Sequence, residues 1–323
     1  MNRIRTLLAL ALAVTGLCHT TASAQSWPSR PITIVVPAPP GGAIDITARL
    51  IGGKLATALG QPVTIENKAG AGTIIGTEAV AKANPDGYTL LIAASAHTIN
   101  PFIFKKLPYD SIKGFEAVIQ THIVPLVMVV TPSLPARSVA EFIAYAKANP
   151  DKLSYASSGS GAPNFMSAEL LKALTGIRMT HVPYKGSTAA HADLLSGRTQ
   201  VMFDTTAAIA PHIKSGGVRA LAVTTPQRSA SMSDVPTLQE AGIKDYEAST
   251  WGGILVPAGT SKEIIARLNV EIGKALASPD VRATMTAAGI EIGGGTPQFF
   301  ADFMRSEMGR WQKVAQTAGI QPE

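Results

Sequence analysis

Cysteine, charge and aromatic rings are all scarce in this chain of 323 residues. Its single cysteine, Cys18, lies in an apolar N-terminal stretch, so a chain that loses this stretch can form neither a disulfide nor a cysteine-ligated metal site. Charged residues make up only 15% and aromatic residues only 6%, and no basic run carries interleaved aromatic rings, which argues against a nucleic-acid-binding protein. After residue 24 no apolar run approaches the length of a transmembrane helix, which predicts a soluble mature chain.

The N-terminus has the build of a secretory signal peptide. Arg3 and Arg5 precede an apolar run at residues 7–14, and Ala22-Ser23-Ala24 follows, which predicts cleavage after Ala24. The apolar run is too short to cross a bilayer as a stable helix. A signal peptide on a mature chain without cysteine predicts a location in the bacterial periplasm.

Strands and helices alternate along the mature chain, which predicts an α/β fold with a parallel sheet. Two similar strands, at residues 126–130 and 218–223, enclose nearly a hundred residues that have an α/β rhythm of their own. This arrangement predicts a second domain inserted into the first. Lobe 1 then comprises residues 27–126 with 227–323, lobe 2 comprises residues 127–226, and the ligand lies in a cleft between them.

The first candidate site is the junction between a strand at residues 32–36 and a helix that starts near Ile44. The chain breaks at Pro37 and passes through Pro40-Gly41-Gly42 before the helix. Such a junction directs free backbone N–H groups and the positive end of the helix dipole at one point, and glycine lets an anion approach the main chain. The junction predicts a carboxylate or phosphate site. A loop that merely turns the chain stays an alternative.

A second junction repeats this chemistry further along the chain. The strand at residues 153–156 leads into Ser157-Ser158-Gly159-Ser160-Gly161-Ala162, and Pro163 suits the first position of the next helix. Three hydroxyls and several amides around two glycines can hold a second polar end of a small ligand. Two such loops facing each other would form a clamp, and a flexible surface loop is the alternative.

Other chemistries find little support. Ser160 lacks the glycines two places before and after it that a hydrolase nucleophile elbow carries. The histidines show no spacing typical of a metal site. Gly70-Ala71-Gly72 resembles a dinucleotide-binding loop, but the next strand, at residues 88–93, ends without the acidic residue that would hold a ribose. The sequence therefore predicts no enzyme, no cofactor and no metal.

Short motifs recur in order over the whole mature chain: Pro40-Gly41-Gly42 with Asp45, Glu66-Asn67 with Gly70-Ala71-Gly72, Pro85-Asp86-Gly87-Tyr88, Leu107-Pro108-Tyr109-Asp110, His181-Val182-Pro183-Tyr184-Lys185-Gly186, and Pro257-Ala258-Gly259-Thr260. In these motifs the chain resembles the Bug family of periplasmic solute-binding receptors, partners of tripartite tricarboxylate transporters. The resemblance implies a two-lobed, type II Venus-flytrap binding protein. It implies a monomer that takes a small di-, tri- or aromatic carboxylate and delivers it to integral membrane transporter subunits.

Carried onto this chain, the resemblance implies two sets of ligand contacts. Those in lobe 1 fall on Pro40, Gly41, Gly42, Ala43, Ala71, Gly72 and Asn100. Those in lobe 2 fall on Ser157, Ser158, Ser160, Gly161, Asn164, Phe165, Tyr184 and Asp204.

Three points about these residues stay open. Ala162 and Phe165 stand where the family usually has a hydroxyl residue and a histidine, which favours an aromatic or partly apolar carboxylate over a citrate-like one. Phe165 either faces the cleft or joins the apolar stripe of its own helix. Asp204 either accepts from a ligand hydroxyl or ammonium, or is a buried acceptor for hinge amides.

Two functions fit this reading. The first is a transport receptor that delivers its ligand to a membrane permease. The second is a ligand-dependent sensor that docks on a membrane signalling protein without feeding uptake. Both need the same ligand-bound form, so the sequence leaves both open.

Overall fold

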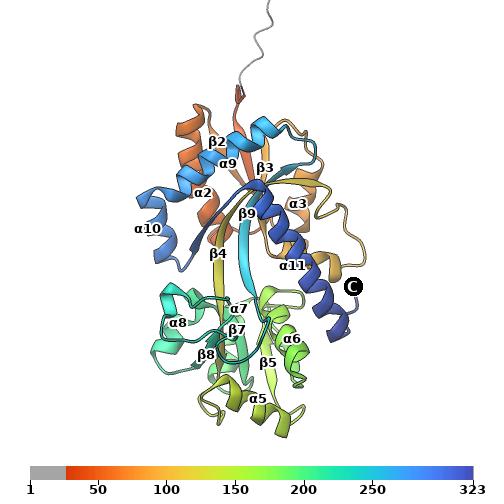
Figure 1. Cartoon of the computed structure of the whole chain (residues 1–323), viewed down its shortest axis with the longest axis vertical. Coiled ribbons are helices and arrows are strands. Elements are labelled where there is room, and N and C mark those ends of the chain that lie inside the picture. Colours follow the sequence, from red (N-terminus) through yellow and green to blue (C-terminus); the bar gives the residue numbers. More distant parts are fainter. Residues whose placement is uncertain (1–26, 323) are drawn as a thin grey trace, which may run out of the picture.

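The computed structural model describes residues 27–322, and the predicted signal peptide with its cleavage site lies outside the described residues. Two α/β lobes follow one another along the longest axis of the molecule, as Figure 1 shows. The structure thus confirms the predicted α/β class and the predicted pair of lobes.

The first lobe is built on the strand order β2-β1-β3-β9-β4, with β10 paired to β4. The three N-terminal strands are parallel, whereas β9 and β10 run antiparallel to their neighbours. The strands are β1 (Ile32–Val36), β2 (Val63–Asn67), β3 (Thr89–Ala94), β4 (Phe115–Val130), β9 (Ser249–Pro257) and β10 (Glu291–Gly294). The helices are α2 (Ala43–Leu59), α3 (Ile74–Ala81), α4 (Ala96–Ile99), α9 (Lys262–Ala277), α10 (Pro279–Ala287) and α11 (Pro297–Ala318), with the short turns η1 (Ala71–Thr73) and η2 (Asn100–Phe102).

The second lobe continues the same sheet in the order β4-β7-β5-β6, with β8 also paired to β4. The strands are β5 (Ser154–Ser157), β6 (Thr180–Pro183), β7 (Val201–Thr205) and β8 (Arg219–Val223). The helices are α5 (Val139–Ala148), α6 (Pro163–Thr175), α7 (Ser187–Leu195) and α8 (Thr206–Lys214), with the turn η3 (Ala230–Met232).

Strand β4 joins the two lobes. Its first part, up to Pro125, pairs with β9, and its last part, from Leu126, pairs with β7 and β8. The side chain of Thr224, just after β8, ties the two crossing segments together. Its Oγ1 accepts from the backbone N–H of Leu126 at 3.1 Å and donates to the Leu126 carbonyl at 3.0 Å. Strand β4 and the segment after β8 are thus held together near residue 126.

The return crossing lies later in the chain than predicted. After β8, residues 227–248 remain packed on the second lobe, because Leu238 and Tyr246 are buried in its apolar cluster with Tyr155. The Tyr246 hydroxyl also donates to the Ser167 carbonyl at 2.8 Å. The chain re-enters the first lobe only with β9. By these contacts residues 227–248 belong with the second lobe, whereas the sequence predicts that lobe 2 ends at residue 226.

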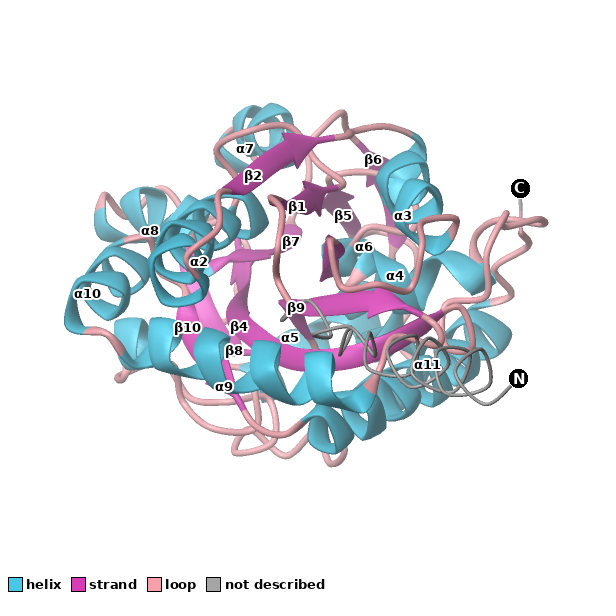
Figure 2. Cartoon of the chain, turned by 90° about the horizontal axis from the view of Figure 1, so that it is seen from above, coloured by secondary structure: helices cyan, strands magenta, loops and turns pink. Residues whose placement is uncertain are grey.

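Helix α11 belongs to both lobes. Phe300 and Met304, in its first half, pack in a first-lobe cluster, whereas Trp311 and Val314 pack in the second-lobe cluster. Figure 1 shows the helix descending from the upper lobe to the lower one, and Figure 2 shows α9 and α11 along one side of the ribbon formed by β4 and β9. Helix α11, which the sequence assigns to lobe 1 with the other C-terminal helices, therefore packs against both lobes.

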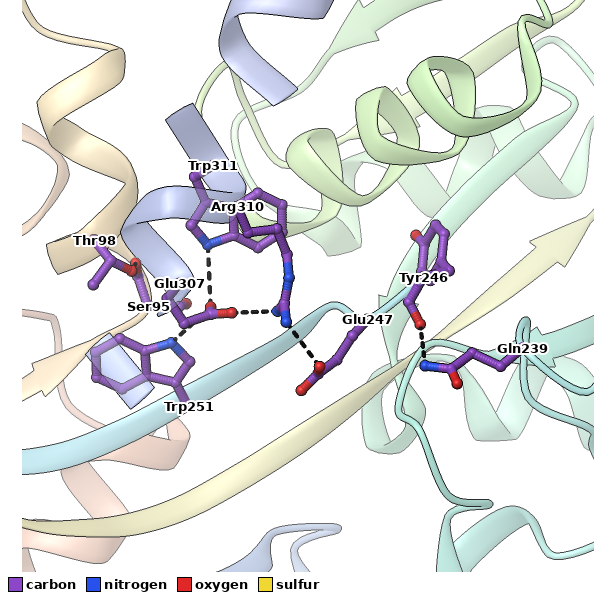
Figure 3. A network of polar contacts seen from close by, with 9 residues as sticks. All are labelled: Ser95, Thr98, Gln239, Tyr246, Glu247, Trp251, Glu307, Arg310 and Trp311. Carbon is purple, nitrogen blue, oxygen red and sulfur yellow. Dashed lines mark hydrogen bonds and ion pairs between the residues drawn. The ribbon is translucent and has the colours of Figure 1, made fainter. Parts of the chain in front are cut away.

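A buried carboxylate fastens α11 to the return crossing (Figure 3). Glu307 accepts from the indole N–H groups of Trp251 at 3.2 Å and Trp311 at 3.1 Å, and it pairs with Arg310. Arg310 also binds Glu247 at 2.7 Å, two residues before β9. Burial raises the pKa of Glu307, and the neighbouring Arg310 opposes this shift. The network fixes the helix where the chain passes between the lobes.

Candidate ligand-binding site

The loop between β1 and α2 presents open backbone donors. Helix α2 begins after Gly42, which as N-cap has no side chain that could accept from the first helical N–H groups. Gly41 and Gly42 are exposed, and a Cβ added to either would meet nothing within 4 Å. Gly41 has a φ of 96°, a conformation that glycine adopts without strain. The first turn of α2, at the positive end of the helix dipole, thus has no side-chain cap.

A side-chain cluster holds this loop in place. Asp45 Oδ2 accepts from the backbone N–H of Gly41 at 2.9 Å, while Arg49 donates to both oxygens of Asp45 at 3.0 and 2.9 Å. Asn67, at the end of β2, donates to Asp45 Oδ1 at 2.9 Å and to the Ala38 carbonyl at 3.1 Å. Arg49 is the main reason that the pKa of Asp45 falls to about 2. Arg49 also neutralises Asp45, so this acid adds little net negative charge to the helix end.

In the sequence, Asp45 and Asn67 stand out only as members of family motifs, and no structural role is predicted for them. Their function in shaping the loop comes from the fold, because Asn67 reaches Asp45 from a different strand. The spacing of four residues between Asp45 and Arg49 was the available local signal, since such pairs meet on one helix face.

The second first-lobe segment is a tight turn beside Asn100. Ala71, Gly72 and Thr73 have φ angles of 46°, 60° and 80°, and Asn100 Nδ2 donates to the Gly72 carbonyl at 2.7 Å. A Cβ on Gly72 would lie 3.4 Å from the ring of Phe104. Asn100 therefore uses one amide proton to hold the turn.

The turn at residues 71–73 and the loop before α2 are packed together. A Cβ on Gly76, in the first turn of α3, would lie 2.8 Å from the Pro37 Cα and from the Lys68 carbonyl. Only glycine allows this close approach between helix and loop. The two first-lobe segments of the predicted site thus form one surface.

Several polar groups of the serine-rich loop already have hydrogen-bond partners within the second lobe. Ser157 is buried, and its Oγ lies 2.6 Å from His181 Nε2. Asn164 Oδ1 accepts from the N–H and the hydroxyl of Ser158 at 3.2 and 3.1 Å and from the Phe165 N–H at 3.0 Å. Asn164, in the first turn of α6, therefore satisfies one amide of that turn, while the N-cap residue Ala162 makes no side-chain cap bond. The exposed Ser160 keeps its hydroxyl on the surface of the loop.

A contact between Ile103 and Gly161 joins the two lobes at this loop. Gly161 has a φ of 76°, and a Cβ there would lie 2.9 Å from Cγ1 of Ile103. Ile103 comes three residues after Asn100, so the serine-rich loop touches the same first-lobe segment that holds the turn at Gly72. We call the loops at residues 40–43, 71–73 and 157–161, with the segment at residues 100–104, the interlobe site.

Three predicted residues have their functional groups engaged within the second lobe. Phe165 is 8% exposed in the apolar cluster, with its ring 4.6 Å from that of His181. The Tyr184 hydroxyl donates to Asp193 at 2.7 Å, and burial together with this carboxylate raises the pKa of Tyr184 to about 12.

Asp204 is the most completely engaged of the three, at 2% exposed. It accepts from the Ser187 hydroxyl at 3.0 Å, from the Thr205 N–H at 2.8 Å and from His191 Nε2 at 2.6 Å. These contacts correspond to the buried-acceptor alternative for Asp204. The contribution of all the predicted residues to ligand binding stays a prediction.

In residues 27–322 no group of three or more histidine, cysteine or acidic side chains could hold a metal ion. No helix in this range has the length and hydropathy that crossing a bilayer requires.

Comparison with known proteins gives a consistent result. A family model described as the tripartite tricarboxylate transporter family receptor matches residues 47–320. A UPF0065 protein from the tcbD-tcbE intergenic region of a Pseudomonas species is 40% identical over 97% of this chain and 94% of its own length.

Several solved structures share both fold and sequence with this chain. A protein of R. palustris solved with adipate has a TM-score of 0.78 and 39% identity, covering 92% of this chain and 100% of that one. The periplasmic binding protein BugD has a TM-score of 0.75 and 32% identity, with coverages of 92% and 100%. MatC from Rhodopseudomonas palustris, solved with bound malate, has a TM-score of 0.74 and 33% identity, with coverages of 90% and 100%.

These proteins are periplasmic solute-binding receptors, not enzymes. Their similarity extends over nearly the whole described chain and includes both lobes. It confirms the resemblance that the sequence motifs indicate. The chain therefore belongs to the tripartite tricarboxylate transporter receptor family.

Proposed function

We propose that this protein binds a small carboxylate at the interlobe site and delivers it to the membrane subunits of a tripartite tricarboxylate-type transporter. The observation that carries this proposal is the open first turn of α2 at Gly41 and Gly42. Backbone amides at such an end form charge-assisted hydrogen bonds to an ionised carboxylate, and the helix dipole favours the negative charge. Adipate and malate, the ligands of two related structures, are both carboxylates.

The second lobe would complete the site by packing against the first lobe and would contribute no charged group. Its exposed Ser160 hydroxyl can donate to the far end of the ligand. The contact of Gly161 with Ile103 brings the loop against the first lobe and shields the ligand from water. Desolvation strengthens each hydrogen bond to the carboxylate. In this proposal binding stabilises the conformation in which the lobes touch.

Transport also requires the chain to reach the periplasm and to meet its permease. The signal peptide proposed for residues 1–24, cleaved after Ala24, supplies the first requirement. The family match to transporter receptors favours uptake over the sensor alternative. Loss of carboxylate uptake in a strain lacking this protein, with restoration by the full-length chain, is the expected result. Unchanged uptake of every bound carboxylate would contradict delivery.

The binding proposal is tested with matched ligands on the mature chain that starts at Gln25. Isothermal titration calorimetry at pH 7 compares adipate, malate and succinate with their uncharged diamides. We expect at least one acid to bind and its diamide to bind at least about a hundredfold more weakly, because a neutral amide loses the charge-assisted bonds. Equal binding of acid and diamide, or binding of a neutral sugar with no carboxylate bound, would contradict the proposal.

A further inference from the structure

We propose that His181 is a positioning residue of the interlobe site. Its neutral imidazole accepts the hydroxyl proton of Ser157 and thereby fixes the backbone of the serine-rich loop, so that the loop presents one conformation to the ligand. This inference rests on the proposed function and deepens it. It also assigns a role to His181, the first residue of a family motif, for which the sequence predicts none.

The sheet of the second lobe brings His181 to the start of this loop. Strands β5 and β6 are parallel, with Tyr155 opposite His181, so the two side chains lie on one face of the sheet. Ser157, two residues after Tyr155, lies on the same face because side chains alternate along a strand. His181 Nε2 consequently lies 2.6 Å from Oγ of the fully buried Ser157. The contact joins two neighbouring strands at the point where the serine-rich loop begins.

The distances indicate the direction of this hydrogen bond. The Ser157 hydroxyl has one proton, and its two candidate acceptors are His181 Nε2 at 2.6 Å and the Gly159 carbonyl at 3.2 Å. The shorter separation is typical of an O–H donor and lies below the usual range of N–H···O bonds. Burial lowers the pKa of His181, which keeps the imidazole neutral at pH 7 and leaves Nε2 free to accept. The ring proton of His181 is therefore assigned to Nδ1.

Ser157 in turn holds the loop. With its proton directed to His181, Oγ of Ser157 keeps a lone pair for the backbone N–H of Gly159, 3.2 Å away. A side-chain bond of this kind to the backbone two residues on fixes a turn. Further along the loop, Gly161 lies against Ile103 of the first lobe. The hydroxyl that the proposed function assigns to the ligand lies between these two fixed glycines.

Aromatic rings and an ion pair surround the imidazole of His181. The ring is stacked on Tyr155 with centroids 4.9 Å apart and lies 4.6 Å from the ring of Phe165. The Tyr155 hydroxyl donates to Glu169, which also pairs with Lys172 at 2.7 Å. Desolvation by burial is the largest influence on the pKa of the imidazole, and the charge of Glu169 opposes it while that of Lys172 adds to it. A loop held by such a fixed acceptor is already ordered, which lowers the cost of binding.

Two substitutions separate the acceptor from the ring. His181→Phe keeps an aromatic ring for the stack and removes the acceptor, whereas His181→Gln loses the ring and keeps a side-chain amide oxygen as acceptor. Calorimetry on the mature chain at pH 7 uses whichever of adipate, succinate and malate binds the wild type most tightly. Its affinity should fall about fivefold in His181→Phe and stay within about twofold of wild type in His181→Gln. The control His212→Phe changes a histidine whose ring lies near that of His191, and it should bind as the wild type does.

The partner residue and the ring proton give two further readouts. Ser157→Ala should lower affinity by a factor similar to that of His181→Phe. The double variant should lose no more than either single variant, because both substitutions remove the same bond. Long-range proton–nitrogen NMR correlations of the wild-type imidazole should show the proton on Nδ1. This signature does not depend on whether a variant folds.

Each outcome supports or overturns the inference. Wild-type affinity in His181→Phe, equal losses in His181→Phe and His181→Gln, or additive losses in the double variant would overturn it while the proposed function stands. A proton on Nε2 of His181 would also overturn it, because the imidazole would then donate. Binding of no carboxylate by the wild-type chain would overturn the proposed function itself, so the two failures are distinguishable.

Discussion

Two helices in this protein start directly after a strand and a glycine-containing loop, yet their first turns differ. At α2 the N-cap is Gly42, which makes no side-chain cap bond and has open space around its Cα. At α6 the first residue is Pro163, which has no N–H, and Asn164 Oδ1 accepts from the N–H of Phe165. Neither N-cap residue makes a side-chain cap bond, but Asn164 satisfies one amide in the first turn of α6, whereas α2 has no such partner in its first turn. An anion-binding helix end must be left without a cap of its own.

The support of the two ends differs in the same way. Asp45 and Asn67 hold the α2 loop in place by binding the Gly41 N–H and the Ala38 carbonyl, respectively. At α6 the Asn164 side chain accepts from the Phe165 amide and from the N–H and hydroxyl of Ser158. We therefore assign the charged end of the ligand to the first lobe. The second lobe would supply shape and a neutral hydroxyl.

The largest effect is expected from closing the open end. Gly42→Val places a branched side chain between the α2 amides and the bound oxygens, and it should cost about 3 kcal/mol of binding, roughly a hundredfold in Kd. Calorimetry with adipate or succinate measures the loss, and circular dichroism checks the fold. Gly53→Val is the matched control, since Gly53 lies exposed in the same helix with open space around it. Wild-type affinity in the Gly42 variant would reduce the loop to a simple turn.

The pH dependence of binding distinguishes the charge of the ligand carboxylate from that of Asp45. The folded pKa of Asp45, about 2, lies below its ordinary value of 3.8, so the stabilisation it contributes is complete above pH 3.8 and is lost as the pH falls through 2. An ordinary ligand carboxyl titrates near about pH 4, before the loop loses its support. Affinity should fall about tenfold for each pH unit below the pKa of the ligand. Calorimetry between pH 7 and 3.5 measures this slope, and a flat profile would contradict a bound carboxylate.

The charge of Asp45 itself provides the control for that titration. Asp45→Asn removes the ion pair with Arg49 and should weaken binding at every pH by a similar factor. The pH at which affinity begins to fall should stay with the ligand. A shift of that pH in Asp45→Asn would mean that Asp45, and not the ligand, titrates.

Removing the Asn164 side chain tests whether the start of α6 contributes to ligand affinity as the start of α2 is expected to do. Asn164→Ala removes the acceptor of the Phe165 and Ser158 donors and should lower the free energy of unfolding by about 1 kcal/mol, the typical net contribution of an intramolecular hydrogen bond. Ligand affinity should change by less than about tenfold, because this end does not carry the charge. Denaturant unfolding and calorimetry give the two values. A loss of binding as large as that of Gly42→Val would make the two ends equivalent.

The smallest effect is expected at Ser158. Its hydroxyl donates to Asn164, so Ser158→Ala should cost about 0.5 to 1 kcal/mol of stability and leave binding nearly unchanged. Ser160→Ala, on the exposed part of the same loop, is the matched comparison and should affect affinity more than stability. Thermal unfolding and calorimetry on both variants resolve the pair. The reverse pattern would mean that Ser158 faces the ligand.

Local patterns in the sequence were enough to predict the α/β class and the position of the loops that precede α2 and α6. Strand and helix periodicities, proline and glycine act over a few residues, so they are readable without a fold. The repeated strands at residues 126–130 and 218–223 likewise indicated a second lobe. The motif series indicated the family, which the comparisons confirm.

Which groups remain available for a ligand was decided only by tertiary structure. Residues 227–248 pack on the second lobe because Leu238 and Tyr246 are buried there, although β9 of the first lobe follows directly in sequence. Asp204 is engaged by Ser187 and His191, more than ten residues away along the chain. Hydrogen bonds and apolar contacts join residues by distance in space, which a local pattern does not encode. The sequence by itself therefore determined where the loops are, whereas packing between distant segments decided that Asp204 is engaged and that residues 227–248 pack on the second lobe.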